Sequence, residues 1–224
     1  MIMEKLKSAL RLDLVLTLWQ AERLTGWPPE LVLHYAHQAG MRIVVRELGL
    51  TRNSRPQSVT FLCCDQKVAT YDGDLLRQLA GTAAMRLLCQ APWSEWTVLA
   101  HQGGIQISPG VWAAVPVPDA VWARWDDGQL TQWWIEYDVG SHVHSVLAVR
   151  MQTYARPASY GDVPRPQMWG AATRERTEFL MGVARAALPP SAICVVRTVD
   201  WTSPRPHRGP GGQRLRIQSE AVTP

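Results

Sequence analysis

The sequence Asp126-Asp127-Gly128, set between two apolar strand-like stretches, constrains the fold more than any other feature of the chain. Asp-Gly between alternating apolar runs is a strong signal for a tight β-hairpin. The flanking stretches are 110–125 and 130–140, and a third strand-like stretch, 95–102, precedes them. Three strand-like stretches in a row predict that the centre of the chain forms a β-sheet.

Helices are predicted before and after this sheet. The segment 74–90 has apolar residues at helical spacing and follows Asp72-Gly73, a turn signal that we take as a domain boundary. Two more helices and two more strands are predicted at 141–155, 173–188, 167–171 and 193–201. The order from residue 74 onward is therefore α-β-β-β-α-β-α-β. This order predicts an α/β (α+β) fold with a mixed sheet.

The first 72 residues have a different order of elements. Helices, the last one starting with Pro28 and Pro29, are followed by a strand, a basic turn and a second strand, at 4–20, 18–26, 28–40, 41–50, 51–57 and 58–69. This is the order of a winged helix-turn-helix, which places its last helix in the major groove of DNA and its wing on the backbone. A structural helical hairpin beside a β-ribbon would give the same pattern.

A set of polar residues in this region is predicted to contact nucleic acid. The candidate recognition helix carries no Lys or Arg, and the turn after it is basic. The predicted nucleic-acid-binding residues are His34, His37, Gln38, Arg42, Arg52 and Arg55. The arginines suit phosphate contacts. Double-stranded DNA is the expected partner, and a homodimer is considered as well.

Composition and charge are compatible with this interpretation. The chain has 224 residues, with 46% hydrophobic and 19% charged, which is ordinary globular composition. Residues 1–60 have a net charge of +3, residues 91–140 have −5, and residues 201–224 have +3. Basic ends suit a polyanionic partner. No apolar run approaches a membrane span and no signal peptide is recognised, so we expect a cytoplasmic, nucleoid- or plasmid-associated protein without membrane contact.

Three carboxylates on the predicted sheet form a candidate metal site. Asp119 is assigned to the second strand, and Glu136 and Asp138 share one face near the end of the third. Neighbouring strands would bring these acids together, and carboxylate oxygens suit Mg²⁺ or Mn²⁺, which can promote phosphoryl transfer. The alternative is an ordinary acidic strand edge. His142 and His144, which follow, are interpreted as surface residues.

The chain resembles the PD-(D/E)XK nuclease fold in its αβββαβ order and acidic motifs, and more closely the bacterial plasmid replication-relaxation family. The resemblance covers roughly residues 10–200. It rests on the segments 18–40, 115–121, 134–141 and 146–155, which include Pro118-Asp119-Ala120, the sequence Glu136-Tyr137-Asp138-Val139-Gly140-Ser141, and Arg150 with Tyr154. It implies a winged helix-turn-helix over 1–72, a PD-(D/E)XK-like domain over 73–201 and a disordered basic tail over 202–224.

This sequence departs from the nuclease pattern in ways that favour a degenerate site. Asp138 stands where the nuclease signature has Lys, and Arg150 stands where the family's helix usually offers Lys. The helix at 74–90 lacks the interior acid that many active nucleases use. The resemblance makes Asp119, Glu136, Asp138 and Arg150 the candidate catalytic residues, yet we expect Arg150 to neutralise the acids. The expected function is DNA binding in replication, relaxation or transcription control. The alternatives are an active Mg²⁺- or Mn²⁺-dependent endonuclease and a protein-binding scaffold.

Overall fold

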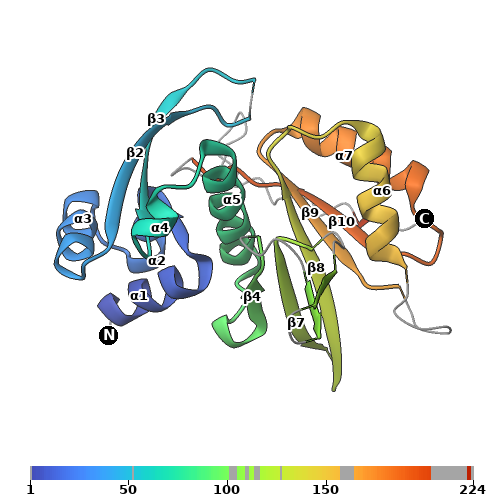
Figure 1. Cartoon of the computed structure of the whole chain (residues 1–224), viewed down its shortest axis with the longest axis horizontal. Helices are drawn as coiled ribbons and strands as arrows, with labels where there is room; N and C mark the ends of the chain where they lie inside the picture. The colour runs from blue at the N-terminus through green and yellow to red at the C-terminus, as the bar shows by residue number, and fades with distance from the viewer. Residues whose placement is uncertain are drawn as a thin grey trace, which may run out of the picture.

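The computed structural model describes residues 2–51, 53–100, 105–108, 111–113, 117–126, 128–156, 164–202 and 221–222 (Figure 1). The first part of the chain is a group of helices beside a small sheet. Its elements are α1 (Ile2–Asp13), β1 (Val15–Thr17), α2 (Leu18–Thr25), α3 (Pro29–Gln38), β2 (Arg42–Leu48), β3 (Gln57–Cys63) and α4 (Gln66–Ala69). The strands form an antiparallel sheet in the order β1-β3-β2.

Local sequence signals explain where α2 begins and ends. The Thr17 hydroxyl accepts a hydrogen bond from the amide of Gln20, and the Gln20 side chain accepts one from the amide of Thr17, which is a capping box. Gly26 ends the helix in the left-handed region, with φ of 74°. The expected helix over 4–20 is broken, because Leu14 also has a positive φ, of 65°, and the chain continues as β1.

The larger sheet and its helices follow. Their elements are α5 (Gly73–Cys89), the 3₁₀ helix η1 (Trp93–Glu95), β4 (Trp96–Val98), β7 (Ala120–Asp126), β8 (Gln129–Asp138), α6 (His144–Ala155), β9 (Gln167–Ala171), α7 (Arg174–Ala187), β10 (Cys194–Thr198) and β11 (Ala221–Val222). The strand order is β11-β10-β9-β8-β7-β4. Strands β4, β7 and β8 are antiparallel, whereas β8, β9 and β10 are parallel, so the mixed α/β sheet expected from the sequence is confirmed.

The larger sheet has helices on both faces, with α5 on one and α6 and α7 on the other (Figure 1). Alternation along β8 divides its side chains between these layers. Ile135 and Tyr137 belong to the core under α5, and Trp134 belongs to the core under α6 and α7. Helix α5 approaches β8 so closely that a Cβ atom on Gly81 would lie 2.1 Å from the ring of Tyr137.

The N-terminal elements pack directly on α5, so one hydrophobic cluster crosses the predicted boundary at 72/73. Arg86 of α5 forms a buried ion pair with Asp13 at the end of α1, with Nη2 2.6 Å from Oδ2. The ring of Trp201, just beyond β10, lies 5.9 Å from that of Phe61. Helix α5 thus contributes to the cores of both parts of the chain.

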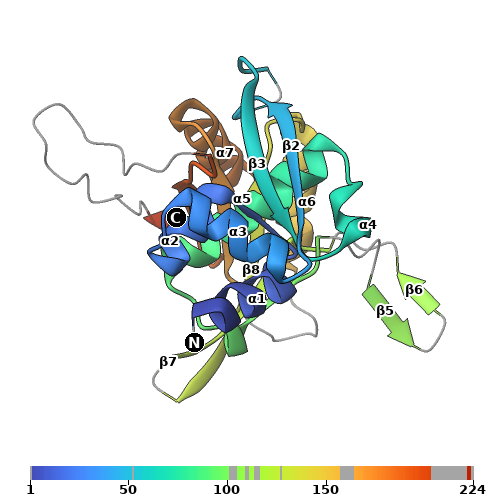
Figure 2. The same cartoon turned by 90° about the vertical axis from the view of Figure 1, so that its left-hand side faces the viewer.

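The boundaries of several predicted elements differ from those in the structure. The strand predicted over 110–125 is divided: β5 (Ile105–Ser108) and β6 (Val111–Ala113) form a separate hairpin (Figure 2), and β7 starts only at Ala120. Most of the predicted disordered tail at 202–224 lies outside the described residues, although the short strand β11 within it pairs with β10. Among the helices that the structure describes, none has the length and apolarity needed to cross a membrane.

Candidate functional site

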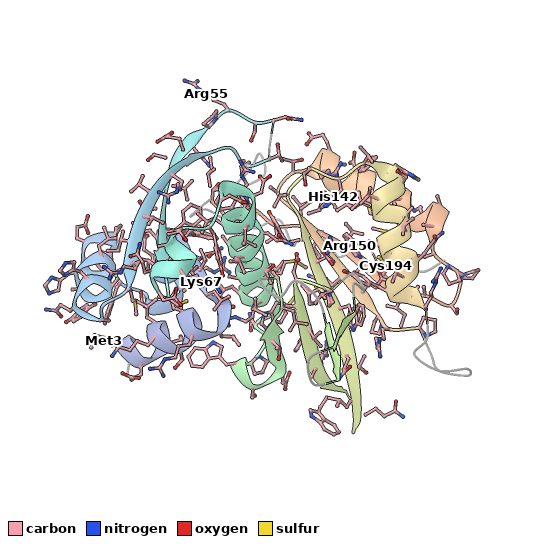
Figure 3. All side chains as sticks on the ribbon, viewed as in Figure 1. Met3, Arg55, Lys67, His142, Arg150 and Cys194 are labelled. Carbon is pink, nitrogen blue, oxygen red and sulfur yellow. The ribbon has the colours of Figure 1, made fainter. Side chains whose placement is uncertain are left out.

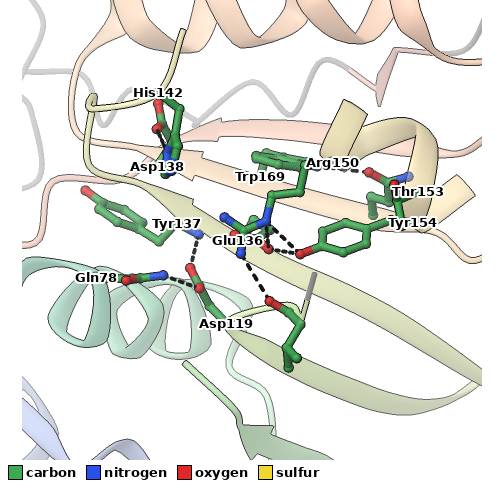
Figure 4. Close-up of polar contacts among 12 residues, drawn as sticks. Gln78, Asp119, Glu136, Tyr137, Asp138, His142, Arg150, Thr153, Tyr154 and Trp169 are labelled. Carbon is green, nitrogen blue, oxygen red and sulfur yellow. Dashed lines mark hydrogen bonds and ion pairs between the residues drawn. The ribbon is translucent and has the colours of Figure 1, made fainter. Parts of the chain in front are cut away.

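Asp119 lies immediately before β7, rather than within a strand, and its carboxylate binds the backbone of β8. Pro118 has no amide hydrogen, so it cannot extend the ladder of β7. The amide of Tyr137 donates to Asp119 Oδ2 at 2.6 Å, and the Gln78 side-chain amide of α5 donates to Oδ1 (Figure 4). The pairing of Ala120 with Ile135 brings Asp119 opposite Glu136. These two acids are therefore brought together, as expected.

Glu136 is paired with a cation from α6. Arg150 Nε lies 3.1 Å from Glu136 Oε1, and the hydroxyl of Tyr154, one helical turn after Arg150, donates to the same oxygen. Arg150 also donates from Nε to Tyr154 at 2.9 Å and from Nη2 to the carbonyl of Val117 at 3.2 Å. Arg150 therefore connects α6 to the carboxylate on β8 and to the chain entering β7 (Figure 4).

Asp138 has a different set of partners, so the expectation that Arg150 would cover all three acids is wrong. Arg176 of α7 donates from Nε to Asp138 Oδ2 and from Nη2 to the carbonyl of His142 at 2.6 Å. His142 Nδ1 lies 3.6 Å from Asp138 Oδ1, which is an ion-pair distance but too long for a hydrogen bond. Because β8 ends at Asp138, this side chain faces the start of α7 instead of α6.

Burial controls the electrostatics of the first two acids. Burial raises the pKa of Asp119 to about 6, although the amide of Tyr137 and the charge of Arg150 favour its ionised form. Burial and the neighbouring charge of Asp119 raise the pKa of Glu136, whereas Arg150 and Tyr154 lower it. The two acids therefore compete for one cation.

Asp138 titrates in the opposite direction. Burial by itself would raise its pKa, but the nearby imidazole of His142 and the hydrogen bond and charge of Arg176 outweigh burial, so the pKa is lowered. The carboxylate of Asp138 is therefore held as an ion against α7. This makes Asp138 a structural link between β8, the segment leading to α6, and α7.

The chemistry open to this site is limited by its own side chains. No cluster of three or more His, Cys, Asp or Glu residues able to hold a metal ion occurs in the described ranges. Asp119 accepts hydrogen bonds from the amide of Tyr137 and the side-chain amide of Gln78, and Glu136 Oε1 contacts the guanidinium of Arg150 and the hydroxyl of Tyr154. The arrangement of these residues fits a closed charge cluster.

Sequence reasoning missed two members of the site. Gln78 lies in the middle of α5, where only the absence of an acid had been noted, and Arg176 lies in the first turn of α7, far along the chain. Gln78 gave only a weak signal, because α5 also contains the polar residues Arg77, Thr82 and Arg86, which are buried. Arg176 gave no signal, because an arginine in a charged first turn is usually solvated.

The predicted nucleic-acid-binding residues lie on the N-terminal elements. His34, His37 and Gln38 are exposed and share one face of α3. Arg42 is exposed at the start of β2, and Arg55 is exposed near the turn of the β2–β3 hairpin (Figure 3). Arg52 lies outside the described residues. Figure 2 shows α3 and the β2–β3 hairpin on the same side of the molecule.

Comparison of the chain with protein-family models, with curated proteins and with solved structures gave no match. The function must therefore be argued from the residues and their geometry.

Proposed function

We propose that the protein binds double-stranded DNA through α3 and the β2–β3 hairpin. The observation that carries the proposal is the order α1-β1-α2-α3-β2-β3 with a β1-β3-β2 sheet, which leaves one polar face of α3 exposed beside a protruding hairpin. A winged helix-turn-helix has this order of elements, and its last helix enters the major groove. It supports a role in plasmid or chromosomal replication, relaxation or transcription control, as in the replication-relaxation family.

The proposed DNA-binding residues fall into two groups, one for phosphate contacts and one for base contacts. Arg42 and Arg55 are cations on the strand and hairpin that flank α3, and they suit contacts to phosphate. Gln38 and the two histidines of α3 can donate to and accept from base edges, and Gln recognises adenine through paired hydrogen bonds. Helix α3 lacks Lys and Arg, so phosphate neutralisation is assigned to the flanking residues.

We propose further that the larger sheet and its helices form a nuclease-like scaffold without nuclease activity. The elements α5, β4, β7, β8, α6 and β9 follow the αβββαβ order of PD-(D/E)XK proteins. Arg150 takes the position where a divalent cation would neutralise Glu136. An arginine stays protonated and cannot handle protons as lysine can. We therefore expect no nicking of supercoiled plasmid with Mg²⁺ or Mn²⁺. Nicking that disappears in Asp119→Ala and Glu136→Ala would establish an active endonuclease instead.

Salt-dependent DNA binding tests the main proposal. Fluorescence anisotropy of a labelled duplex should show affinity that falls as salt rises, because phosphate contacts release counterions. The variant Arg42→Ala/Arg55→Ala should bind more weakly to every sequence, with a salt slope reduced by about 2. The matched control is Arg185→Ala, an exposed arginine in the last turn of α7. Absence of salt-dependent binding by the unaltered protein would overturn the proposal.

A further inference from the structure

The turn of the β2–β3 hairpin is attached to the end of the larger sheet. The indole nitrogen of Trp201, just beyond β10, donates a hydrogen bond to the carbonyl of Leu50 at 3.3 Å. A Cβ atom on Gly140, which follows β8, would lie 3.6 Å from the Cβ of Thr51. In Figure 1 the turn reaches from the small sheet towards the upper end of the larger one. The hairpin is therefore held at its turn as well as by its own sheet.

The side chain that holds the hairpin is itself firmly placed. Trp201 is fully buried, and its ring stacks on that of Phe61 in the core that both parts of the chain share. Its carbonyl accepts a hydrogen bond from the hydroxyl of Thr17 at 3.4 Å. Two residues earlier, the amide of Val199 donates to the carbonyl of Ala171 at the end of β9, at 2.8 Å. The indole N–H therefore comes from a rigid part of the molecule.

A compact turn connects this attachment to Arg55. The amide of Thr51 donates to the hydroxyl of Ser54 at 2.8 Å, and the hydroxyl and amide of Ser54 donate to the carbonyl of Thr51 at 3.0 and 3.2 Å. Because these bonds close the turn, the position of Arg55 depends on that of Leu50. Arg55 stays exposed, and Figure 3 shows it at the outer edge of the molecule. The attached hairpin thus presents its arginine to solvent.

We infer that Trp201 is a positioning residue for DNA binding, because its hydrogen bond to Leu50 holds the hairpin where Arg55 contacts phosphate. The inference rests on the proposed DNA binding and adds that the hairpin binds DNA while it is attached to the larger sheet. A segment that is ordered before binding loses less conformational entropy when it binds. Without the attachment, only the fraction of molecules with a correctly placed hairpin binds tightly.

A substitution that leaves the charge unchanged tests this role. Trp201→Phe keeps an aromatic ring on Phe61 and removes the indole N–H. Affinity for a labelled duplex should fall about 3- to 10-fold, the equivalent of one hydrogen bond. The salt slope should decrease by up to about 1, because Arg55 loses its phosphate contact. The matched control is Trp169→Phe, which removes a buried indole N–H that donates to Gln167 at 3.1 Å in the core under α6 and α7. It should leave the salt slope unchanged.

A reversible cross-link tests whether the hairpin binds DNA in its attached position. In Thr51→Cys/Gly140→Cys the two Cβ atoms would lie 3.6 Å apart, within the range of about 3.5–4.5 Å that disulfides require. Gly140 has a φ of 87°, so its replacement is strained, and the reduced form of the same variant is the reference. The oxidised form should bind the duplex at least as tightly as the reduced form. Each single variant, treated with the same oxidant, controls for disulfides to the partly exposed native thiol of Cys64.

The outcomes distinguish this inference from the proposed function. Absence of salt-dependent binding by the unaltered protein would overturn both. If the unaltered protein binds DNA but the disulfide weakens binding by about tenfold or more, the hairpin must leave the larger sheet to reach DNA, and only the inference is wrong. Equal changes of affinity and salt slope in Trp201→Phe and Trp169→Phe would also overturn it, because a general loss of packing would then explain both variants.

Discussion

Arg150 Nε lies 3.1 Å from Glu136 Oε1, and the hydroxyl of Tyr154 contacts both groups. Glu136 is only 2% exposed and lies beside a second buried acid, Asp119. A buried carboxylate in such a place needs a proton, a metal ion or a basic side chain. In this chain the basic side chain comes from α6. The pair therefore ties α6 to β8.

Removing Arg150 should be costly because it leaves Glu136 buried without a cation. We expect Arg150→Met to lower the free energy of unfolding by about 3–5 kcal/mol. Glu136→Gln/Arg150→Met should lose clearly less, since the remaining group is neutral. Urea unfolding of the unaltered protein, both single variants and the double variant completes the thermodynamic cycle. Equal losses in Arg150→Met and the double variant would show that the ion pair contributes only through packing.

Asp119 should make stability depend on pH. Its pKa rises from the ordinary value of 3.8 to about 6 in the folded protein, so folding favours the protonated acid. The stability it contributes is complete below about pH 4 and is lost as pH rises through about 6. Asp119→Asn should therefore match the unaltered protein near pH 4 and exceed it at pH 8, by on the order of 1–3 kcal/mol. Urea unfolding across this range measures the difference.

Asp65 provides a control of opposite sign. Its carboxylate accepts a hydrogen bond from the amide of Val68 at the start of α4, which lowers its pKa. Asparagine caps helices about as well as aspartate, so Asp65→Asn changes mainly the charge. This variant should be less stable than the unaltered protein at neutral pH, and the difference should vanish as pH falls below the lowered pKa. The same direction of change in both variants would show that net charge, rather than burial, dominates.

The order of elements could be predicted because it depends on local signals. Asp72 caps α5, and Thr173 caps α7, each within a few residues of an apolar helical pattern. The first and last residues of the strands were harder to predict from the sequence. Strand β1 is three residues long and exists because it pairs with β3, which no local pattern around Leu14 could reveal. Tertiary pairing there overrides local preference.

The candidate site was predictable only in part, for a related reason. The proximity of Asp119 and Glu136 could be predicted because Asp119 immediately precedes β7, which a hairpin connects to β8. The partner of Asp138 could not, because Arg176 is 38 residues away and reaches it only after α6 and β9 are in place. Gln78 is likewise 41 residues from Asp119. Contacts across such distances depend on packing, which the sequence pattern does not encode locally.

Close packing between α5 and β8 should make Gly81 intolerant of a side chain. A Cβ atom there would lie 2.1 Å from the Tyr137 ring, which is held by a hydrogen bond from its hydroxyl to the carbonyl of Val199. Gly81→Ala should destabilise the protein by about 1–3 kcal/mol or more, as overpacking does. Gly182→Ala on α7 is the control, because nothing lies within 4 Å of its Cβ position. It should instead stabilise by roughly 0.5–1 kcal/mol in thermal or urea unfolding.

If the protein binds DNA as proposed, α3 should contact the bases and the β2–β3 hairpin should contact the phosphates. Gln38 is exposed on α3 with His34 and His37, whereas Arg55 is exposed on the hairpin. Once a preferred duplex has been selected from a random library, Gln38→Ala should weaken binding to that duplex. The expected loss is about 1–3 kcal/mol, because one base contact disappears.

Binding of Gln38→Ala to unrelated duplexes should change little. The difference in affinity between the selected duplex and unrelated duplexes should therefore become smaller. Arg55→Ala should weaken binding to all duplexes alike, because a phosphate contact carries no sequence information. Gln132→Ala, an exposed glutamine on β8, serves as the matched control. If Gln38→Ala and Arg55→Ala instead reduced binding to every duplex by the same factor, α3 would be only another electrostatic contact, and its assignment as the recognition helix would be wrong.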